Sequence, residues 1–359
     1  MRKLNILVLP GDHIGPEITA AALGIAAEAH QLLGLPLEFR SAEIGHISLQ
    51  QAGHTFPEGV MAAARAADGI ILGPCDTYGY PPANRGGANP SSTLRLALDL
   101  YANIRPSRSV AGVPALARGA DLVIVRENTE GFYADRNMFA GSGEFMPTPE
   151  VALAVRKVTA PASQRIARVA CELASRRRKK LTIVSKANVL KLSDGLFLHE
   201  ARSVAAQYPE LAVDHILVDA MASHLVRTPQ AFDVVVTTNM FGDILSNQAA
   251  ELCGGLGLAG SLNAGDQHAM AQASHGSAPD LAGADRANPC ALIFSVAMLF
   301  DWLGKRHANQ ALAAAGALID RATLEVLADA ALRTADLGGP LGTQAFAQQV
   351  RGRLARLAA

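Results

Sequence analysis

The chain lacks the features that mark membrane, exported and nucleic-acid-binding proteins. Its 32 basic and 32 acidic side chains balance, so no net charge draws the protein toward nucleic acid or an anionic membrane. No apolar run reaches the length of about eighteen residues that a membrane span needs. The first residues have neither the apolar length nor the cleavage site of a signal peptide. We therefore expect a cytoplasmic protein with no nucleic-acid or membrane partner.

Cysteine is also scarce, and the four cysteines form no CxxC pair: Cys75, Cys171, Cys253 and Cys290. We expect free thiols in a reducing compartment.

The one dense basic run, Ser175–Lys180, follows a helical pattern and precedes an apolar run. A solvated helix C-terminus accounts for it better than a nucleic-acid patch does, because the helix dipole favours cations there.

Short apolar runs alternate with Ala-rich amphipathic stretches along most of the chain. The amphipathic stretches include residues 16–33 and 161–177, and the chain after about residue 288 has a helical pattern. This alternation predicts an α/β protein with mostly buried strands. The predicted strands are 4–10, 69–74, 121–126, 181–186, 213–219 and 232–239.

Polar residues close several of these apolar runs. Arg126, Lys186, Asp219 and Asn239 each stand at such an end. In open α/β sheets, ligands bind at the carboxyl ends of the strands. The positions therefore indicate a binding site.

Three arginines are candidates for binding carboxylates. Arg95 lies in a predicted helix, Arg105 lies in an extended segment before Pro106, and Arg126 ends a strand. Guanidinium groups bind carboxylates through two parallel hydrogen bonds, so such a set suits a substrate with two or three carboxylates. The alternative is that each forms a structural ion pair, for example Arg126 with Glu127.

Oxygen-bearing side chains suggest a metal site. Asp243 and Asn247 are four residues apart and share one helical face, and Asp219 follows a strand. Such ligands suit Mg²⁺ or Mn²⁺. The alternative for Asp243 is capping of the helix N-terminus.

Lys186 and Tyr133 are candidate proton carriers, because a lysine near a cation has a lowered pKa and can act as a base.

Two loops could hold a nucleotide. The glycine loop 11–17 does not have the GxGxxG pattern, and by itself is weak evidence for phosphate binding. The loop 275–289 is rich in Gly, Pro and Asp, and its Asp280 could accept hydrogen bonds from ribose hydroxyls. Either loop could equally be a surface connection.

Together these segments resemble the β-decarboxylating dehydrogenases, which include isocitrate, isopropylmalate, homoisocitrate and tartrate/D-malate dehydrogenases. The resemblance is carried, in the family's order, by "LPGDHIGPE", "LRLALDLYANIRP", "IVRENTEGFY", "SKANVLK", "NMFGDILSNQAAELCGGLGLAGS" and "HGSAPDLAG…ANP". It implies an α/β fold of the isopropylmalate dehydrogenase type, with two domains and an active-site cleft between them. The expected large nucleotide-binding domain is discontinuous (1–101 and 253–359), and the small domain (102–252) carries a homodimer contact.

The resemblance also implies roles for individual residues. Arg95, Arg105 and Arg126, with Ser91, correspond to substrate-binding positions, and Tyr133 to the proton donor. Lys186 is the expected base, acting with Asp219, and both correspond to positions that reach into the partner's site. The expected metal ligands are Asp219, Asp243 and Asn247. The expected NAD-binding residues are His275, Gly276, Ser277, Ala278, Asp280 and Asn288.

The implied reaction is NAD- and Mg²⁺- or Mn²⁺-dependent oxidative decarboxylation of a (2R)-hydroxy di- or tricarboxylic acid. NAD is favoured over NADP because Asp280 keeps the acid of the NAD enzymes, and a carboxylate repels a 2′-phosphate. Near the first arginine, the stretch "RGGANPSSTLR" offers hydroxyls and no apolar cluster. That favours an isocitrate/homoisocitrate-like or malate/tartrate-like substrate, and isopropylmalate is an alternative.

The sequence departs from the family at two positions. Asn247 stands where most relatives have aspartate, and Gln272 replaces an expected acid. Both changes remove negative charge, and they keep a second hypothesis open, a non-catalytic or regulatory subunit of a heteromeric dehydrogenase. Dehydrogenation without decarboxylation is a third.

Overall fold

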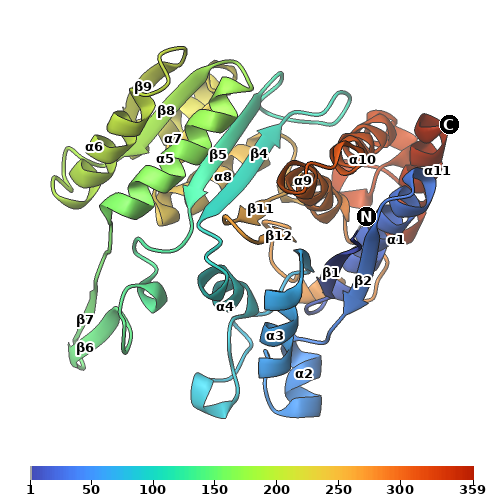
Figure 1. Ribbon diagram of the computed structural model, residues 1–359, viewed down its shortest axis with the longest axis horizontal. Helices are drawn as coiled ribbons and strands as arrows, with labels where there is room; N and C mark the ends of the chain where they lie inside the picture. The colour runs from blue at the N-terminus through green and yellow to red at the C-terminus, as the bar shows by residue number, and fades with distance from the viewer. Residues whose placement is uncertain (1) are drawn as a thin grey trace. The chain divides into compact units, whose positions relative to one another are not determined.

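The computed structural model describes residues 2–359, which form two compact units (Figure 1). Unit 1 contains the described residues up to Asp99 together with Val110–Ala115 and Gly254–Ala359, and unit 2 contains Leu100–Ser109 and Leu116–Cys253. Both are α/β. None of the helices found in residues 2–359 has the length and apolarity needed to cross a membrane.

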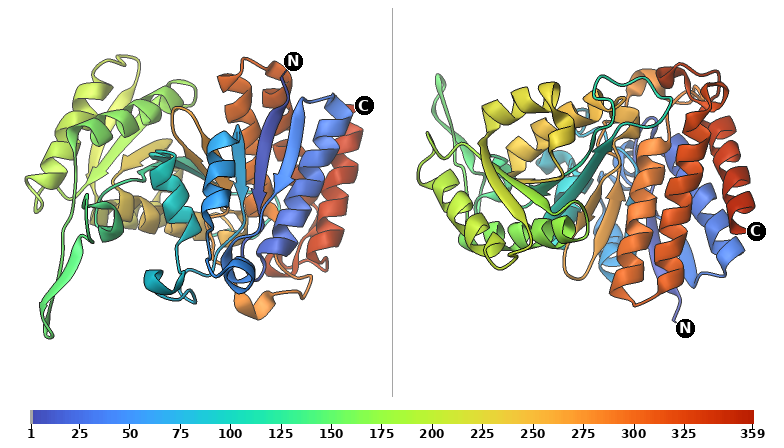
Figure 2. Two further views of the ribbon diagram at one scale, coloured as in Figure 1. Left: turned by 60° about the horizontal axis from the view of Figure 1, so that its bottom comes forward. Right: turned by 90° about the horizontal axis from the view of Figure 1, so that it is seen from above.

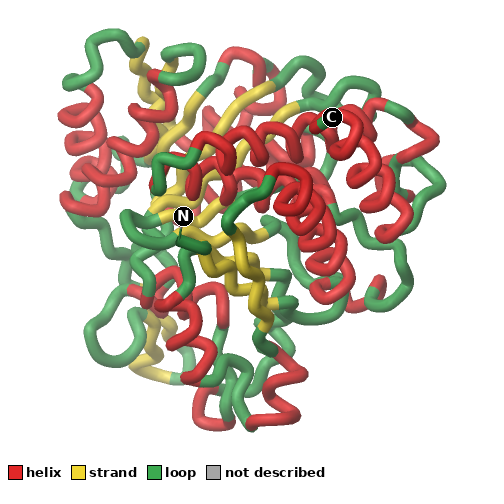
Figure 3. Tube along the Cα trace, turned by 45° about the vertical axis from the view of Figure 1, so that its right-hand side comes forward, coloured by secondary structure: helices red, strands yellow, loops and turns green. Residues whose placement is uncertain are grey.

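The sheet of unit 1 has the order β2 (Leu37–Ser41), β1 (Leu4–Leu9), β3 (Gly69–Leu72), β12 (Ala269–Gln272) and β11 (Leu262–Ala264). Its neighbouring strands are parallel except that β11 is antiparallel to β12. Figure 3 shows helices packed around these strands. The helices of unit 1 are α1 (Gly15–Leu33), α2 (Gly45–Ala52), α3 (Glu58–Ala66), α4 (Pro90–Ala97), α9 (Cys290–Arg306), α10 (Gln310–Ala328) and α11 (Thr343–Ala358).

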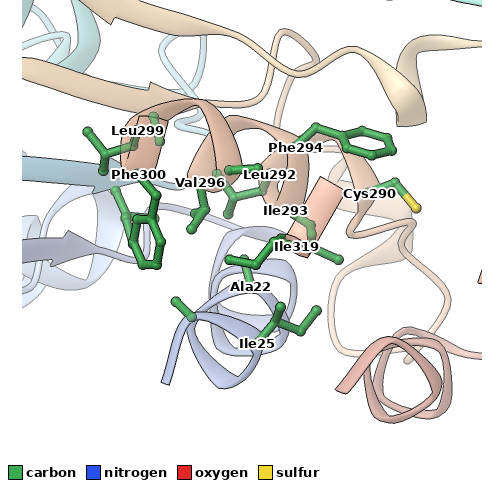
Figure 4. Close-up of a cluster of buried hydrophobic side chains, with 14 of the residues drawn as sticks. Ala22, Ile25, Cys290, Leu292, Ile293, Phe294, Val296, Leu299, Phe300 and Ile319 are labelled. Carbon is green, nitrogen blue, oxygen red and sulfur yellow. The ribbon is translucent and has the colours of Figure 1, made fainter. Parts of the chain in front are cut away.

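Helix α9 forms the centre of the core of unit 1. Residues 290–297 are all buried, as expected of a helix segment that is covered on every side, and only the C-terminal end of the helix carries charged residues. Figure 4 shows its Ile293 together with Ile25 of α1 and Ile319 of α10. Leu299, nearer the C-terminal end of α9, lies beside Gly69 of strand β3. The core thus joins the sheet to the helices on which the chain ends.

The sheet of unit 2 has the order β4 (Ala102–Arg108), β5 (Asp121–Glu127), β10 (Val234–Thr237), β8 (Lys180–Ser185) and β9 (Ala212–Leu217). Only β4 runs antiparallel to its neighbour. Its helices are α5 (Ala160–Ser175), α6 (Ser193–Ala205), α7 (Val218–Arg227) and α8 (Asn239–Leu252). A ribbon of β6 (Glu144–Thr148) and β7 (Val151–Ala154) extends away from the rest of this unit (Figure 2).

Both faces of the unit 2 sheet are covered. Along β5, Val123 and Val125 pack with α5 and α6, whereas Leu122 and Ile124 pack with α7 and α8. Successive side chains of a strand point to opposite faces, so a strand covered on both sides is apolar throughout. All six apolar runs predicted as strands are confirmed as strands, and burial on both faces explains them except for β9, an edge strand with no buried residue. The helical pattern after residue 288 is confirmed as α9, α10 and α11.

Gly242 sets the approach of α8 to β5. A Cβ atom at this position would lie 2.7 Å from both Cβ and Cγ of Arg126. Real Cβ atoms do not come so close to a side chain that is itself packed. The absence of a side chain at residue 242 therefore fixes the distance between the strand that carries Arg126 and the helix that carries Asp243.

We expect Gly242→Ala to push α8 away from β5 and to lower the free energy of unfolding by about 1–3 kcal/mol, the usual cost of overpacking. The matched control is Gly195→Ala in α6, where a Cβ would meet no atom within 4 Å. That change should be neutral or stabilise by about 0.5–1 kcal/mol. Urea unfolding of both variants checks the prediction, and equal stabilities would contradict it.

The turn after β5 contains a buried carboxyl group with a raised pKa. Glu130 accepts hydrogen bonds from the backbone N–H (2.7 Å) and the hydroxyl (3.0 Å) of Thr159, the N-cap residue of α5. Burial raises the pKa of Glu130 from 4.5 to about 7. The native state therefore holds this proton more tightly than the unfolded chain does.

The contribution of Glu130 to stability is complete below about pH 4.5 and is lost as the pH rises to about 7. A difference of this size corresponds to about 3 kcal/mol. Glu130→Gln keeps groups that can bond Thr159 and cannot ionise. We expect its stability relative to the wild type to increase by about 1–3 kcal/mol between pH 5 and pH 8. Denaturant unfolding across this range checks the prediction, and Glu144→Gln, at an exposed position, is the control.

Candidate active site

In unit 2, one carboxylate brings together three of the residues predicted to form the site. Asp243 of α8 accepts hydrogen bonds at Oδ1 from Nη1 of Arg105 (2.9 Å) and Nη1 of Arg126 (2.5 Å). Its Oδ2 accepts a hydrogen bond from the Tyr133 hydroxyl. The guanidinium groups come from neighbouring strands β4 and β5, and the carboxylate comes from the helix beside them.

Polar neighbours hold both arginines in place. Arg105 donates to Asn103 (2.5 Å) and to the Ser246 hydroxyl (2.8 Å). Arg126 donates through Nε to the Asn239 side chain (2.8 Å), which in turn donates to the Glu130 carbonyl (2.7 Å). These contacts fix the planes of the guanidinium groups, as a site for a carboxylate substrate requires.

The two guanidinium groups are strongly desolvated. The side chain of Arg126 is only 2% exposed and that of Arg105 only 6%. Burial, and next the charge of Arg105, lower the pKa of Arg126 to about 9. Both groups share a single oxygen of Asp243, so this carboxylate does not balance their combined charge. The cluster is suited to receive a further anion.

The environment of Tyr133 keeps its phenol protonated. Burial, and next the hydrogen bond to Asp243, raise its pKa above the usual value. The guanidinium carbons of Arg126 and Arg136 lie 5.4 and 5.2 Å from its ring centroid. A protonated hydroxyl beside guanidinium groups can act as a proton donor.

Arg105 and Arg126 do form ion pairs, as the alternative from the sequence allowed, but the partner suggested for Arg126 and the capping role suggested for Asp243 are wrong. Arg126 pairs with Asp243, whereas Glu127 accepts hydrogen bonds from Thr129 and from the backbone N–H of Glu130. Successive side chains of a strand point to opposite faces, which separates the two neighbours. Asp243 does not cap a helix, because α8 begins four residues earlier, at Asn239.

Asn247 lies one turn after Asp243 on α8. Its Oδ1 is buried and has no hydrogen-bond partner among the described residues. An unpaired buried carbonyl oxygen is costly unless it has a ligand. Together, the carboxylate and the amide oxygen form a donor set that fits a hard divalent cation.

Lys186 and Asp219 form a second polar group in unit 2. Lys186 follows β8, Asp219 lies in the first turn of α7, and Nζ is 2.5 Å from Oδ1. The hydrogen bond from Lys186 lowers the pKa of Asp219. Asp219 remains mostly exposed. The structure thus joins the predicted base to a predicted metal ligand.

In unit 1, Gln272 holds two of the predicted substrate-binding residues. Its Oε1 accepts hydrogen bonds from the Ser91 hydroxyl (2.9 Å) and from Nη2 of Arg95 (3.0 Å). Ser91 and Arg95 lie one turn apart on α4, and Gln272 ends β12. Because the acceptor is an amide, it orients Arg95 without neutralising its charge.

The loop after β12 contains the residues predicted to bind NAD. Ala278 has a positive φ (42°), and Asp280 is exposed. Asn288 is buried, where it donates to Asp336 (2.9 Å) and accepts from the backbone of Cys290. His275 contacts the carbonyl of Gly276 (3.0 Å), and burial lowers its pKa. The Ser277 carbonyl accepts a hydrogen bond from Ile14 (3.1 Å), which joins this loop to the glycine loop after β1.

Reasoning from the sequence missed two residues that position Arg105. Asn103 lies two residues before it on the same strand face, and Ser246 lies three residues after Asp243 on the same helix face. The spacings could have identified them once Arg105 and Asp243 were paired. That pairing is a contact across 138 residues of sequence, which no local pattern reveals.

The chain is similar to known proteins over nearly its whole length. Residues 5–350 match the family model described as isocitrate/isopropylmalate dehydrogenase. The chain is 41% identical to the 3-isopropylmalate dehydrogenase of Methanothermobacter thermautotrophicus, covering 99% of each chain. It is 41% identical to the isocitrate/homoisocitrate dehydrogenase of Thermus thermophilus, covering 96% of this chain and 97% of the relative.

Solved structures show the same fold. The isocitrate dehydrogenase from Methylococcus capsulatus superposes with a TM-score of 0.86 at 38% identity, covering 98% of this chain and 99% of that one. The expected fold class and the expected decarboxylating oxidoreductase activity are thereby confirmed. The chain belongs to the isocitrate/isopropylmalate dehydrogenase family.

Proposed function

We propose that the protein catalyses NAD- and divalent-metal-dependent oxidative decarboxylation of a (2R)-hydroxy di- or tricarboxylic acid. The products would be a 2-oxo acid, CO₂ and NADH. The observation that carries the proposal is the Asp243 carboxylate, shared by Arg105, Arg126 and the Tyr133 hydroxyl. Buried guanidinium groups whose charge is only partly balanced favour a substrate that carries several carboxylates.

The proposed substrate-binding groups are Arg105 and Arg126 of unit 2 and Arg95 and Ser91 of unit 1. Arg95 donates a hydrogen bond to the amide oxygen of Gln272, which carries no charge, so this contact orients the guanidinium group without neutralising it. A glutamate in place of Gln272 would compete for the same guanidinium group. The polar side chains of this segment favour an isocitrate/homoisocitrate-like or malate/tartrate-like acid over isopropylmalate.

A divalent cation, Mg²⁺ or Mn²⁺, would be held by Asp243 and Asn247, with Asp219 as a further ligand. When bound, such a cation polarises the hydroxyl and carbonyl oxygens of a substrate. Asn247 supplies an oxygen without charge, so it holds a cation less strongly than aspartate would. The unpaired Oδ1 of Asn247 supports its role as a ligand.

Two residues would move protons. Lys186, hydrogen-bonded to Asp219, would accept the proton of the substrate hydroxyl as hydride passes from C2 to the nicotinamide. Tyr133, which is kept protonated by its surroundings, would then give a proton to the carbon that has lost CO₂.

We further propose a cytoplasmic homodimer in which Lys186 and Asp219 of one chain serve the site of the other.

NAD would bind the loop of His275, Gly276, Ser277, Ala278 and Asp280, together with Asn288. Asp280 is exposed. We propose that its carboxylate contacts the adenosine ribose of NAD. A carboxylate accepts hydrogen bonds from free ribose hydroxyls and repels a 2′-phosphate, so we propose NAD in preference to NADP.

The function is tested with the purified full-length protein, NAD, Mn²⁺ and a panel of isocitrate, homoisocitrate, malate, tartrate and isopropylmalate. We expect equal amounts of NADH and CO₂ with a polar hydroxy acid. NADH without CO₂ would indicate simple dehydrogenation. No NADH with any acid would favour the non-catalytic subunit, which the amides Asn247 and Gln272 motivate.

Replacing the proposed base should abolish turnover. We expect Lys186→Met to lower kcat by at least about 100-fold, because methionine cannot accept a proton, and to leave NAD affinity nearly unchanged. Steady-state kinetics and NAD titration measure the two effects. Lys191→Met, at an exposed position a few residues away, is the control. A Lys186→Met enzyme with an unaltered rate would refute the assignment.

Restoring an acid beside Asp243 should strengthen cation binding. We expect Asn247→Asp to tighten Mn²⁺ binding in the absence of substrate by about ten-fold, since a charged oxygen replaces a neutral one. Gln207→Glu adds the same charge at an exposed position and should have no effect. If titration gives the same Mn²⁺ affinity for Asn247→Asp as for the wild type, residue 247 is not a ligand.

A further inference from the structure

We propose that His13, His46 and Asp76 form a binding site in unit 1 for a transition-metal cation such as Zn²⁺. These residues do not belong to the metal site proposed above. One possible ligand atom from each lies within 4.8 Å of the other two. Nε2 of His13 is 3.1 Å and Nε2 of His46 is 3.0 Å from Oδ2 of Asp76.

These distances are close to those of a tetrahedral zinc site. Zn–N and Zn–O bonds of about 2.0–2.1 Å place neighbouring ligand atoms about 3.3 Å apart. A cation would require shifts of a few tenths of an ångström in the two nitrogen–oxygen distances. The two imidazole nitrogens, which lie within 4.8 Å of each other, would also have to adopt about this separation. The fourth position would be left to water or to an added ligand.

The three ligands come from separate segments that the fold brings together. His13 lies between β1 and α1, His46 lies in the first turn of α2, and Asp76 follows β3. His13 has a positive φ (56°), which is uncommon for a residue with a side chain. A cation here would link three segments that are far apart in the sequence.

A buried carboxylate holds two of these ligand segments in position. Asp12 accepts hydrogen bonds from the backbone N–H groups of His46 (2.8 Å) and Asp76 (2.9 Å), and from the Tyr80 hydroxyl. Such contacts around the ligands reduce the reorganisation that binding requires. Oδ1 of Asp76 accepts a hydrogen bond from Gly79 (3.1 Å), which leaves Oδ2 directed to the imidazoles.

The ligand set determines which cation would bind. Two imidazole nitrogens and one carboxylate suit Zn²⁺, Co²⁺ or Ni²⁺, whereas Mg²⁺ prefers oxygen ligands. The side chains of His13, His46 and Asp76 are between 22% and 33% exposed, so a cation can reach them from solvent. Ile14, next to His13, donates to the Ser277 carbonyl. A cation bound to His13 would thus restrict the motion of the neighbouring Ile14, which contacts the loop proposed to bind the nucleotide.

The test measures binding of Zn²⁺ to the full-length protein after chelator treatment, in an excess of Mg²⁺ that fills oxygen-only sites. Competition with a chromogenic chelator gives the affinity and stoichiometry, and Co²⁺ gives the visible absorption bands of a tetrahedral site. We expect one tight Zn²⁺ per chain. His46→Gln and Asp76→Asn should each weaken binding at least about ten-fold.

Both variants keep groups that can hydrogen-bond across the cluster, so they should fold; thermal unfolding in chelator verifies this. His54→Ala removes an exposed histidine of the same unit and should bind Zn²⁺ like the wild type. The proposal is overturned if the wild type takes up no Zn²⁺, or if His46→Gln and Asp76→Asn bind it as tightly. The result does not depend on any enzymatic activity.

Discussion

The charge of Asp243 is the feature on which the rest of the site depends. Its two oxygens receive two guanidinium groups and a phenol, and the guanidinium groups are almost wholly removed from water. A buried cation without a partner costs several kcal/mol, so these arginines can be buried only beside an acceptor of this kind. The same arrangement leaves positive charge that Asp243 does not balance. One interaction therefore permits the arginines to be buried and prepares the site for an anionic substrate.

The fold supplies this interaction through a few close approaches. Gly242 lets α8 lie against β5, so that the following residue, Asp243, meets Arg126 from the adjacent strand. In unit 1, the end of β12 brings Gln272 to Arg95. Asn247 and Gln272 both end in amides, which carry no charge. Gln272 orients Arg95 without cancelling its charge, and Asn247 leaves an oxygen unpaired.

The sequence revealed much of the fold, because both faces of these sheets are buried. Val234–Thr237 and Gly69–Leu72 are apolar throughout, and such runs are easy to recognise. Beyond an extended segment at Arg105, it did not reveal β4, whose "ANIRPSR" mixes polar residues with a proline and has no apolar run, or the fully exposed β6 and β7. For the site, too, local sequence patterns predicted some features and missed others. Residue types and family motifs indicate Arg105, Arg126, Tyr133 and Asp243 as members of one site, but they do not predict the direct hydrogen bonds that Asp243 accepts from the other three. The His13, His46 and Asp76 cluster comes from three segments with no recognisable spacing, so only the folded chain shows it.

The proposed function requires the Asp243 carboxylate, now bonded to Arg105 and Arg126, to be released to a cation when the carboxylates of a substrate take its place on the two arginines. Binding of acid and cation must then be coupled, and the coupling must be reciprocal. The direct measurement is electron paramagnetic resonance of free Mn²⁺ during titration of the protein, with and without a hydroxy acid that supports turnover, in the absence of NAD. The account predicts that the acid tightens Mn²⁺ binding by about ten-fold or more, a coupling of about 1.4 kcal/mol, and that Asp243→Asn removes the effect. An Mn²⁺ affinity that is the same with and without the acid would contradict it.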